Sequence, residues 1–270
     1  MAFQLKYQIN QRHLTKPSKR RRGIVMSPGV RFVVAHDTGN PGSTAAGNVK
    51  YFERSRNEMS ASAHIFVDDK EIIECIPALD GAPAEKAWHV LYSVPTDNQL
   101  FGFDANDAAI GVEYCYGGRI DADEAYRKYV WVMAYACHKH GLDPKRKVVG
   151  HFFLDPLRKT DPVSGLAHSR MGYEQLLKDV AIEHDICAGI TPELKDFGVS
   201  PQAGTGMATA RLNIRKGAPN TRSPVHQVIP RGAQLNYAGS TNMGEAINGN
   251  STWYADAGGN FFWSGAIQPL

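Results

Sequence analysis

The segment Arg31-Phe-Val-Val-Ala-His36-Asp-Thr-Gly39 sets the expected fold of this chain. Residues 30–35 form an apolar run, which predicts a buried strand. The glycines and the proline that follow predict a loop. The strand therefore delivers His36 to a loop, either as a core histidine at a strand end or as a metal ligand.

Helices and strands alternate over the first two thirds of the chain. We expect helices over residues 43–57, 123–140 and 172–187, the first capped by Ser43 or Thr44 and the second ended by Gly141. A hairpin is predicted over residues 64–77 and another buried strand over 108–116. This alternation indicates an α/β fold, with a central sheet flanked by helices.

A second informative stretch is His151-Phe-Phe-Leu-Asp-Pro-Leu-Arg-Lys159-Thr-Asp161-Pro162. It places a histidine, a lysine and a carboxylate close together in sequence, around a proline-bearing loop. With His36 it supplies two histidines and one carboxylate, and a fourth position left for water would complete a catalytic zinc site. A lysine beside such a metal can neutralise an oxyanion.

Length and composition fit a soluble globular protein. At 270 residues, with 43% hydrophobic and 21% charged residues, one large or two unequal domains are expected. No apolar run is long enough to predict a membrane-spanning helix. The N-terminus lacks the pattern of a signal peptide, so synthesis in the cytoplasm is expected. The four cysteines form no CxxC pair and are expected to be buried thiols.

The composition changes after residue 187. Prolines and glycines in residues 188–206 indicate a linker. Five short strands are then predicted, which implies a small all-β barrel. From residue 207 onward five basic and two acidic residues give this segment the net charge of +3 that the whole chain carries. We therefore expect domains at 1–190 and 207–270, joined by a linker at 191–206.

The basic run Lys16-Pro-Ser-Lys-Arg-Arg-Arg22 has two interpretations. It could contact nucleic acid, but no aromatic residues interleave with the charges, as stacking on single strands requires. We expect a solvated basic loop and no nucleic-acid partner.

The motifs carry a resemblance to a known family. Five ordered segments, VVAHDTGNPG, SAHIFVDD, AWH, AIGVEYCY and GHFFLDPLRKTDP, resemble the zinc-dependent N-acetylmuramoyl-L-alanine amidases of the Amidase_2 type, which share a fold with peptidoglycan recognition proteins. Residues 207–270 resemble a bacterial SH3-like cell-wall-binding module, through ATARLNIRKGAPNTRSPV and the closing Trp263 to Ile267. The resemblance implies a mixed central sheet and, for the second domain, an SH3-like barrel.

The resemblance also assigns roles to individual residues. The family's zinc ligands fall on His36, His151 and Asp161, and its catalytic residues on Glu113 and Lys159. Some members have a tyrosine before the histidine of the hairpin strand, where this chain has Ala63, which leaves proton transfer to Glu113. Two further histidines are candidates for substrate binding: His89, which we expect to line the cleft, and His64, for which a structural role is the alternative.

The implied reaction is hydrolysis of the amide between N-acetylmuramic acid and L-alanine in peptidoglycan. The domain order resembles that of a phage endolysin or autolysin. Nothing in the chain demands more than a monomer, so we expect a monomer, and we expect no membrane partner. It would act, after release, on the peptidoglycan and wall polymers of a Gram-positive host. Two alternatives stay open: a non-catalytic peptidoglycan-binding protein, and a cytoplasmic amidase that recycles soluble muropeptides.

Overall fold

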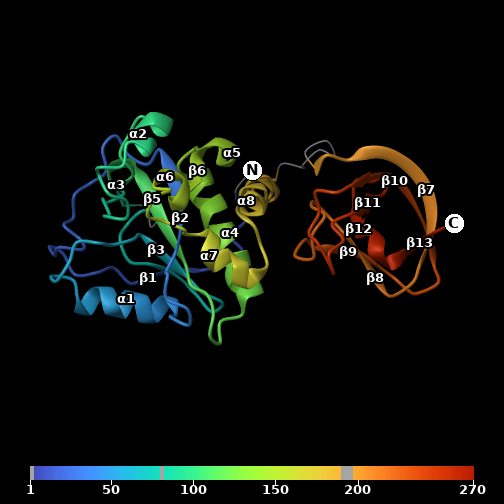
Figure 1. Ribbon diagram of the computed structural model, residues 1–270, viewed down its shortest axis with the longest axis horizontal. Coiled ribbons are helices and arrows are strands. Elements are labelled where there is room, and N and C mark those ends of the chain that lie inside the picture. Colours follow the sequence, from blue (N-terminus) through green and yellow to red (C-terminus); the bar gives the residue numbers. More distant parts are fainter. Residues whose placement is uncertain (1–2, 80–81, 190–196) are drawn as a thin grey trace. The chain divides into compact units, whose positions relative to one another are not determined.

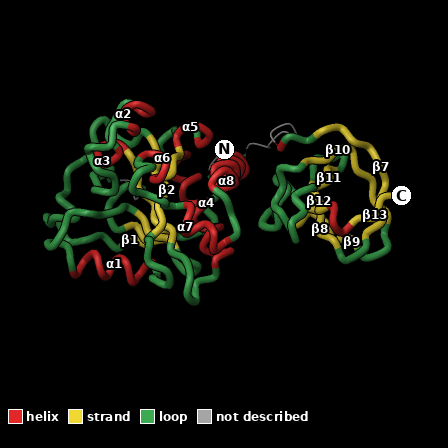
Figure 2. The backbone as a smooth tube through the Cα atoms, in the orientation of Figure 1, coloured by secondary structure: helices red, strands yellow, loops and turns green. Residues whose placement is uncertain are grey.

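The computed structural model describes residues 3–79, 82–189 and 197–270. The chain divides into two compact units, Met1–Ala188 and Gly189–Leu270. Figure 2 shows helices around the strands of the first unit, and mostly strands and loops in the second. Residues 190–196 of the expected linker lie outside the described residues.

The first unit is built on a six-stranded sheet with the order β1-β4-β3-β5-β2-β6 (Figure 1). The strands are β1 (Ile9–Gln11), β2 (Phe32–Asp37), β3 (Ile65–Val67), β4 (Ile72–Glu74), β5 (Ala109–Tyr114) and β6 (Val148–Gly150). β3 and β4 pair antiparallel, as the predicted hairpin requires, whereas β2 pairs parallel with both β5 and β6. The expected mixed sheet is therefore confirmed.

Helices cover both faces of this sheet. The longer ones are α1 (Ala45–Arg54), α4 (Ala122–Lys139) and α8 (Tyr173–Cys187); the shorter ones are α2 (Thr96–Phe101), α3 (Ala105–Ala108), α5 (Pro144–Lys147), α6 (His151–Leu154) and α7 (Val163–Leu166). Neighbouring side chains of one strand enter different cores, as the period of two requires. Val33 packs in the core that contains α4, and Val34 in the core that contains part of α3 and α6.

The predicted helix over residues 43–57 is shorter in the structure. It begins after Thr44, whose side chain accepts a hydrogen bond from the Gly47 amide, so Thr44 rather than Ser43 is the cap. Strand β1 and the short helices α2, α3, α5, α6 and α7 were not predicted. Elements of three to six residues are too short for a hydrophobic period to mark them.

The basic run at residues 16–22 is only partly the solvated loop that we expected, because three of its five basic residues are exposed and the other two are buried. Arg20 and Arg21 are 1% and 7% exposed. The Arg20 guanidinium lies 4.1 Å from the centre of the Phe52 ring, and Arg21 donates two hydrogen bonds of 2.8 Å to the Glu85 carboxylate. A buried guanidinium needs such partners. The two arginines therefore hold the N-terminal segment against the rest of the first unit.

The second unit is an all-antiparallel sheet of seven strands, with the order β13-β7-β10-β11-β12-β8-β9. The strands are β7 (Ser200–Ala208), β8 (Leu212–Arg215), β9 (Val225–Ile229), β10 (Gln234–Thr241), β11 (Trp253–Ala255), β12 (Phe261–Trp263) and β13 (Ile267–Pro269). The five predicted strands correspond to β8–β12. Residues 200–206, which we assigned to the linker, belong to β7, where glycine and proline hide the strand pattern.

All four cysteines are buried and free of disulfides. No helix in the described part of the chain is both long and apolar enough to cross a membrane.

Candidate metal centre

Two parallel strands bring the histidines of both informative stretches to one edge of the sheet. His36 is near the end of β2, and His151 directly follows β6, the parallel neighbour of β2. The chain then returns through a loop, which is fixed where the Phe152 amide donates to the Asp161 carbonyl over 2.9 Å. Asp161 therefore lies beside both histidines, although it is far from His36 in sequence.

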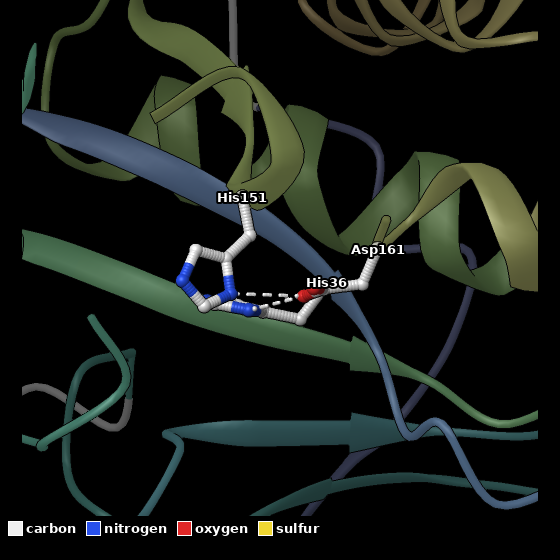
Figure 3. Close-up of side chains that lie close together, drawn as sticks. All are labelled: His36, His151 and Asp161. Carbon is white, nitrogen blue, oxygen red and sulfur yellow. Dashed lines mark hydrogen bonds and ion pairs between the residues drawn. The ribbon is translucent and has the colours of Figure 1, made fainter. Parts of the chain in front are cut away.

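The three side chains converge (Figure 3). One carboxylate oxygen, Oδ2 of Asp161, lies 2.9 Å from Nδ1 of His36 and 3.0 Å from Nδ1 of His151. One ligand atom from each of the three residues lies within 4.8 Å of the others. Both histidines are 2% exposed. The sequence predicted that these three residues form one site, and in the structure their side chains are in contact.

The chemistry of this set fits a divalent metal. Burial lowers the pKa of His36 to about 4, so the imidazole is neutral and can offer a lone pair. Nε2 of His151 is buried and has no hydrogen-bond partner within the described residues. Two imidazole nitrogens and one carboxylate oxygen form the donor set of many three-ligand zinc sites.

Asp37 and Tyr129 hold the centre in place. The Tyr129 hydroxyl donates to the His36 carbonyl over 2.8 Å. One Asp37 oxygen accepts hydrogen bonds from the Ser164 hydroxyl and the Gly165 amide, both at 2.7 Å. Asp37 therefore ties the end of β2 to α7, which follows Asp161 after one residue.

Glu113 and Lys159 are both at the centre. Glu113 lies on β5 in register with His36, and its Oε2 is buried without a hydrogen-bond partner among the described residues. Burial raises the pKa of Glu113 well above its usual range, and the carboxylates of Asp161 and Asp37 raise it further. Glu113 therefore binds a proton more readily than an exposed carboxylate does. Lys159 lies partly buried on the loop that carries Asp161.

A cleft of about 450 Å³ opens over these residues. Its lining includes six of the seven predicted site residues: His36, His89, Glu113, His151, Lys159 and Asp161. His64 does not line it. That residue is 0% exposed; its Nε2 donates to the Glu85 carbonyl over 2.9 Å, and its Nδ1 accepts from the Gly111 amide over 3.0 Å. These contacts are those of a structural histidine.

Other cleft residues were missed in the sequence. The following had no role predicted for them individually: Arg20, Tyr51, Met59, Trp88, Arg158 and Ser164. Trp88 precedes His89 in the AWH motif, which was a usable signal. Arg158 precedes Lys159 in the GHFFLDPLRKTDP motif, which was a similar signal. For residues 20 and 51–59 the sequence holds no comparable signal, because chain folding alone brings them to the cleft.

The fold and the site define a mixed α/β protein with a candidate metal centre at the end of two parallel strands. Residues 26–164 match the family model described as N-acetylmuramoyl-L-alanine amidase, Amidase_2. The chain belongs to this amidase family. The matched segment contains the three candidate ligands together with Glu113 and Lys159.

Individual relatives agree with this family. The N-acetylmuramoyl-L-alanine amidase BlyA of Bacillus subtilis (strain 168) is 36% identical over 152 residues, which cover 53% of this chain and 39% of BlyA. The chain thus matches less than half of the length of that relative. The expected resemblance to this family is confirmed over residues 26–164.

Solved structures show the same fold. The catalytic domain of XlyA is 22% identical with a TM-score of 0.51, over 64% of this chain and 99% of that domain. The Staphylococcus aureus hydrolase AmiA, solved with its ligand, is 24% identical with a TM-score of 0.54, over 70% of this chain and 90% of AmiA.

Proposed function

We propose that this chain is a zinc-dependent amidase that hydrolyses the bond between N-acetylmuramic acid and L-alanine in peptidoglycan. The observation that carries the proposal is the convergence of His36, His151 and Asp161 beside Glu113, within the segment that matches the amidase family. This set of residues is complete, which favours an enzyme over a non-catalytic peptidoglycan-binding protein.

His36, His151 and Asp161 would hold the zinc ion. Bound there, zinc would act as a Lewis acid and lower the pKa of water from ~16 to about 7. The protein's own part is to keep two neutral imidazoles and a carboxylate aimed at one point. The buried β2 and β6 strands and the Asp37 contact to α7 do this.

Glu113 would move the proton in this reaction. As the water oxygen bonds to the amide carbon, Glu113 accepts a water proton. It returns this proton to the alanine nitrogen as the carbon–nitrogen bond breaks. The products are a free lactyl carboxylate and a peptide with N-terminal alanine. A carboxyl group with a raised pKa suits both steps near neutral pH. Lys159 would stabilise the negative charge on the amide oxygen.

The second unit would hold the enzyme on the cell wall as an SH3-like module. Two observations support this role: the second unit is a small antiparallel sheet with its own core, and residues 207–270 carry a net charge of +3. Positive charge suits the anionic wall polymers of a Gram-positive host. Attachment raises the effective substrate concentration without changing the active site. An enzyme made in the cytoplasm and released onto the wall would use this attachment, whereas an amidase that recycles soluble muropeptides would not need it.

Product analysis tests the bond that is cleaved. The purified chain is incubated with Gram-positive cell walls, and free amino groups, new N-terminal residues and reducing sugar ends are assayed. We expect new N-terminal alanine without new reducing ends. Reducing ends would mean that a glycosidic bond is cleaved, and another new N-terminal residue would mean a peptidase. Either result would contradict the proposed amidase.

A further inference from the structure

The His89 ring lies between His36 and the backbone of β5. Its Nδ1 is 3.0 Å from Nε2 of His36, and its Nε2 is 3.2 Å from the Ala109 carbonyl oxygen. The ring packs against Gly111, where an added Cβ would lie 2.9 Å from the imidazole. The His89 amide donates to the Asn106 side chain over 2.8 Å. His89 is therefore fixed on several sides.

These contacts determine where the protons lie. A neutral imidazole carries one N–H, and a carbonyl oxygen can only accept. An uncharged His89 ring can therefore satisfy the Ala109 carbonyl only with its proton on Nε2. His89 must then donate from Nε2 to Ala109, which leaves a lone pair on Nδ1. That lone pair requires a proton on Nε2 of His36.

The proton on Nε2 of His36 also determines the state of the other ring nitrogen, Nδ1. With its proton on Nε2, Nδ1 of His36 carries a lone pair that faces Asp161 Oδ2 at 2.9 Å. Two acceptors at this distance repel each other unless a cation lies against both. A metal ion held by His36 and Asp161 removes the conflict.

We propose that His89 is a positioning residue, which fixes the tautomer of His36 so that Nδ1 is presented to the metal. This inference rests on the proposed function, because it takes His36 as a ligand. A histidine ligand commonly donates its second N–H to such an acceptor, and loss of the acceptor typically lowers metal affinity about 10–100-fold. His151 lacks a comparable partner within the described residues, so His36 is the pre-oriented ligand of the two.

A matched pair of variants tests this role. Asparagine at position 89 keeps an acceptor near the place of Nδ1, and leucine has a similar shape without an acceptor. Zinc affinity is measured for the full chain by competition with a chromophoric chelator. We expect His89→Leu to bind zinc about 10–100-fold more weakly than the wild type, and His89→Asn to stay close to it. Equal losses in both variants, or none in His89→Leu, would overturn the positioning role.

A spectroscopic measurement needs no variant at position 89. Long-range ¹H–¹⁵N spectra of the zinc-loaded wild type report which nitrogen of His36 carries the proton, and His36→Ala identifies the signal. We expect a proton on Nε2. A proton on Nδ1 would refute the inference and leave the zinc site intact. If His36→Ala binds zinc as tightly as the wild type, the metal site of the proposed function is wrong instead.

Discussion

Glu113 has the surroundings of a proton carrier rather than of a structural carboxylate. Its Oε2 is buried without a partner in the described structure, and burial raises its pKa well above the usual range. Burying such a group without a partner costs stability, and carboxylates with strongly shifted pKa values cluster at functional sites. The sequence suggested this role because a carboxylate stands in an otherwise apolar strand.

Replacing the carboxylate of Glu113 separates its role from metal binding. For Glu113→Gln we expect the rate of wall hydrolysis to fall about 10²–10⁴-fold, because the amide cannot accept a proton from water. Zinc content should stay at the wild-type level, since Glu113 is not one of the proposed ligands. The thermal midpoint should not fall, since Glu113 forms no hydrogen bond through Oε2 that the amide would break. Unchanged hydrolysis would exclude Glu113 as the general base.

His64 makes folding stability depend on pH. Burial lowers its pKa to about 4 from 6.5, so between these values the unfolded chain binds a proton that the folded chain does not. Its contribution to stability is therefore lost as pH falls from 6.5 toward 4. Between pH 7 and pH 5 this residue alone should lower the free energy of unfolding by about 2 kcal/mol.

The variant His64→Gln isolates that contribution. Glutamine can donate to Glu85 and accept from Gly111 without titrating. Urea unfolding of metal-free wild type and variant at both pH values should show a smaller pH dependence in the variant, by about 2 kcal/mol. Identical pH dependence of the two proteins would show that His64 is not a buried neutral histidine.

At the scale of elements, helix α7 packs closely against strand β2 at Gly165. An added Cβ at Gly165 would lie 2.7 Å from Cβ of Asp37 and 2.9 Å from Cδ1 of Tyr116. Gly165→Ala should therefore push α7 away from β2, weaken the hydrogen bonds of Asp37 and displace Asp161. We expect a destabilisation of about 1–3 kcal/mol in urea unfolding and weaker zinc binding.

Gly172→Ala is the matched control for that change. Gly172 precedes α8, has a negative φ of −96°, and nothing lies within 4 Å of an added Cβ. The substitution Gly172→Ala should leave zinc binding unchanged. Equal effects of the two substitutions would mean that the close packing at Gly165 does not position Asp161.

The longer helices and strands could be predicted from the sequence, whereas the shortest could not. The apolar runs at 30–35 and 108–116 and the helices at 123–140 and 172–187 were predicted within a few residues, because a period of two or of 3.6 is visible over such lengths. Helix α6 is only four residues long and was missed, although it begins at His151.

The candidate site was predictable in its residues but not in its contacts. Family resemblance supplied His36, His151 and Asp161, and the strand pattern placed His36 at a strand end. The contact between His36 and His89 could not be predicted, because it depends on the close packing of His89 against Gly111. The contacts of His64 with Glu85 and Gly111 depend on tertiary structure in the same way.

At the scale of the whole molecule, two compact units with separate cores make up the chain. Residues 1–188 alone should fold and release N-terminal alanine from soluble muropeptides at the rate of the full chain. Their binding to intact walls should be weaker by on the order of a hundredfold, because the attachment is gone. Pelleting with cell walls measures this affinity. Undiminished wall binding would show that the second unit does not anchor the enzyme.

The central claim is that a zinc ion held by His36, His151 and Asp161 is required for hydrolysis. The most direct measurement is zinc content together with amidase activity, for the wild type before and after chelation, after zinc is restored, and for His151→Ala. We predict about one zinc per chain, loss of activity with the metal, recovery on its return, and neither metal nor activity in His151→Ala. Full activity of the metal-free protein, or zinc retained by active His151→Ala, would contradict the account.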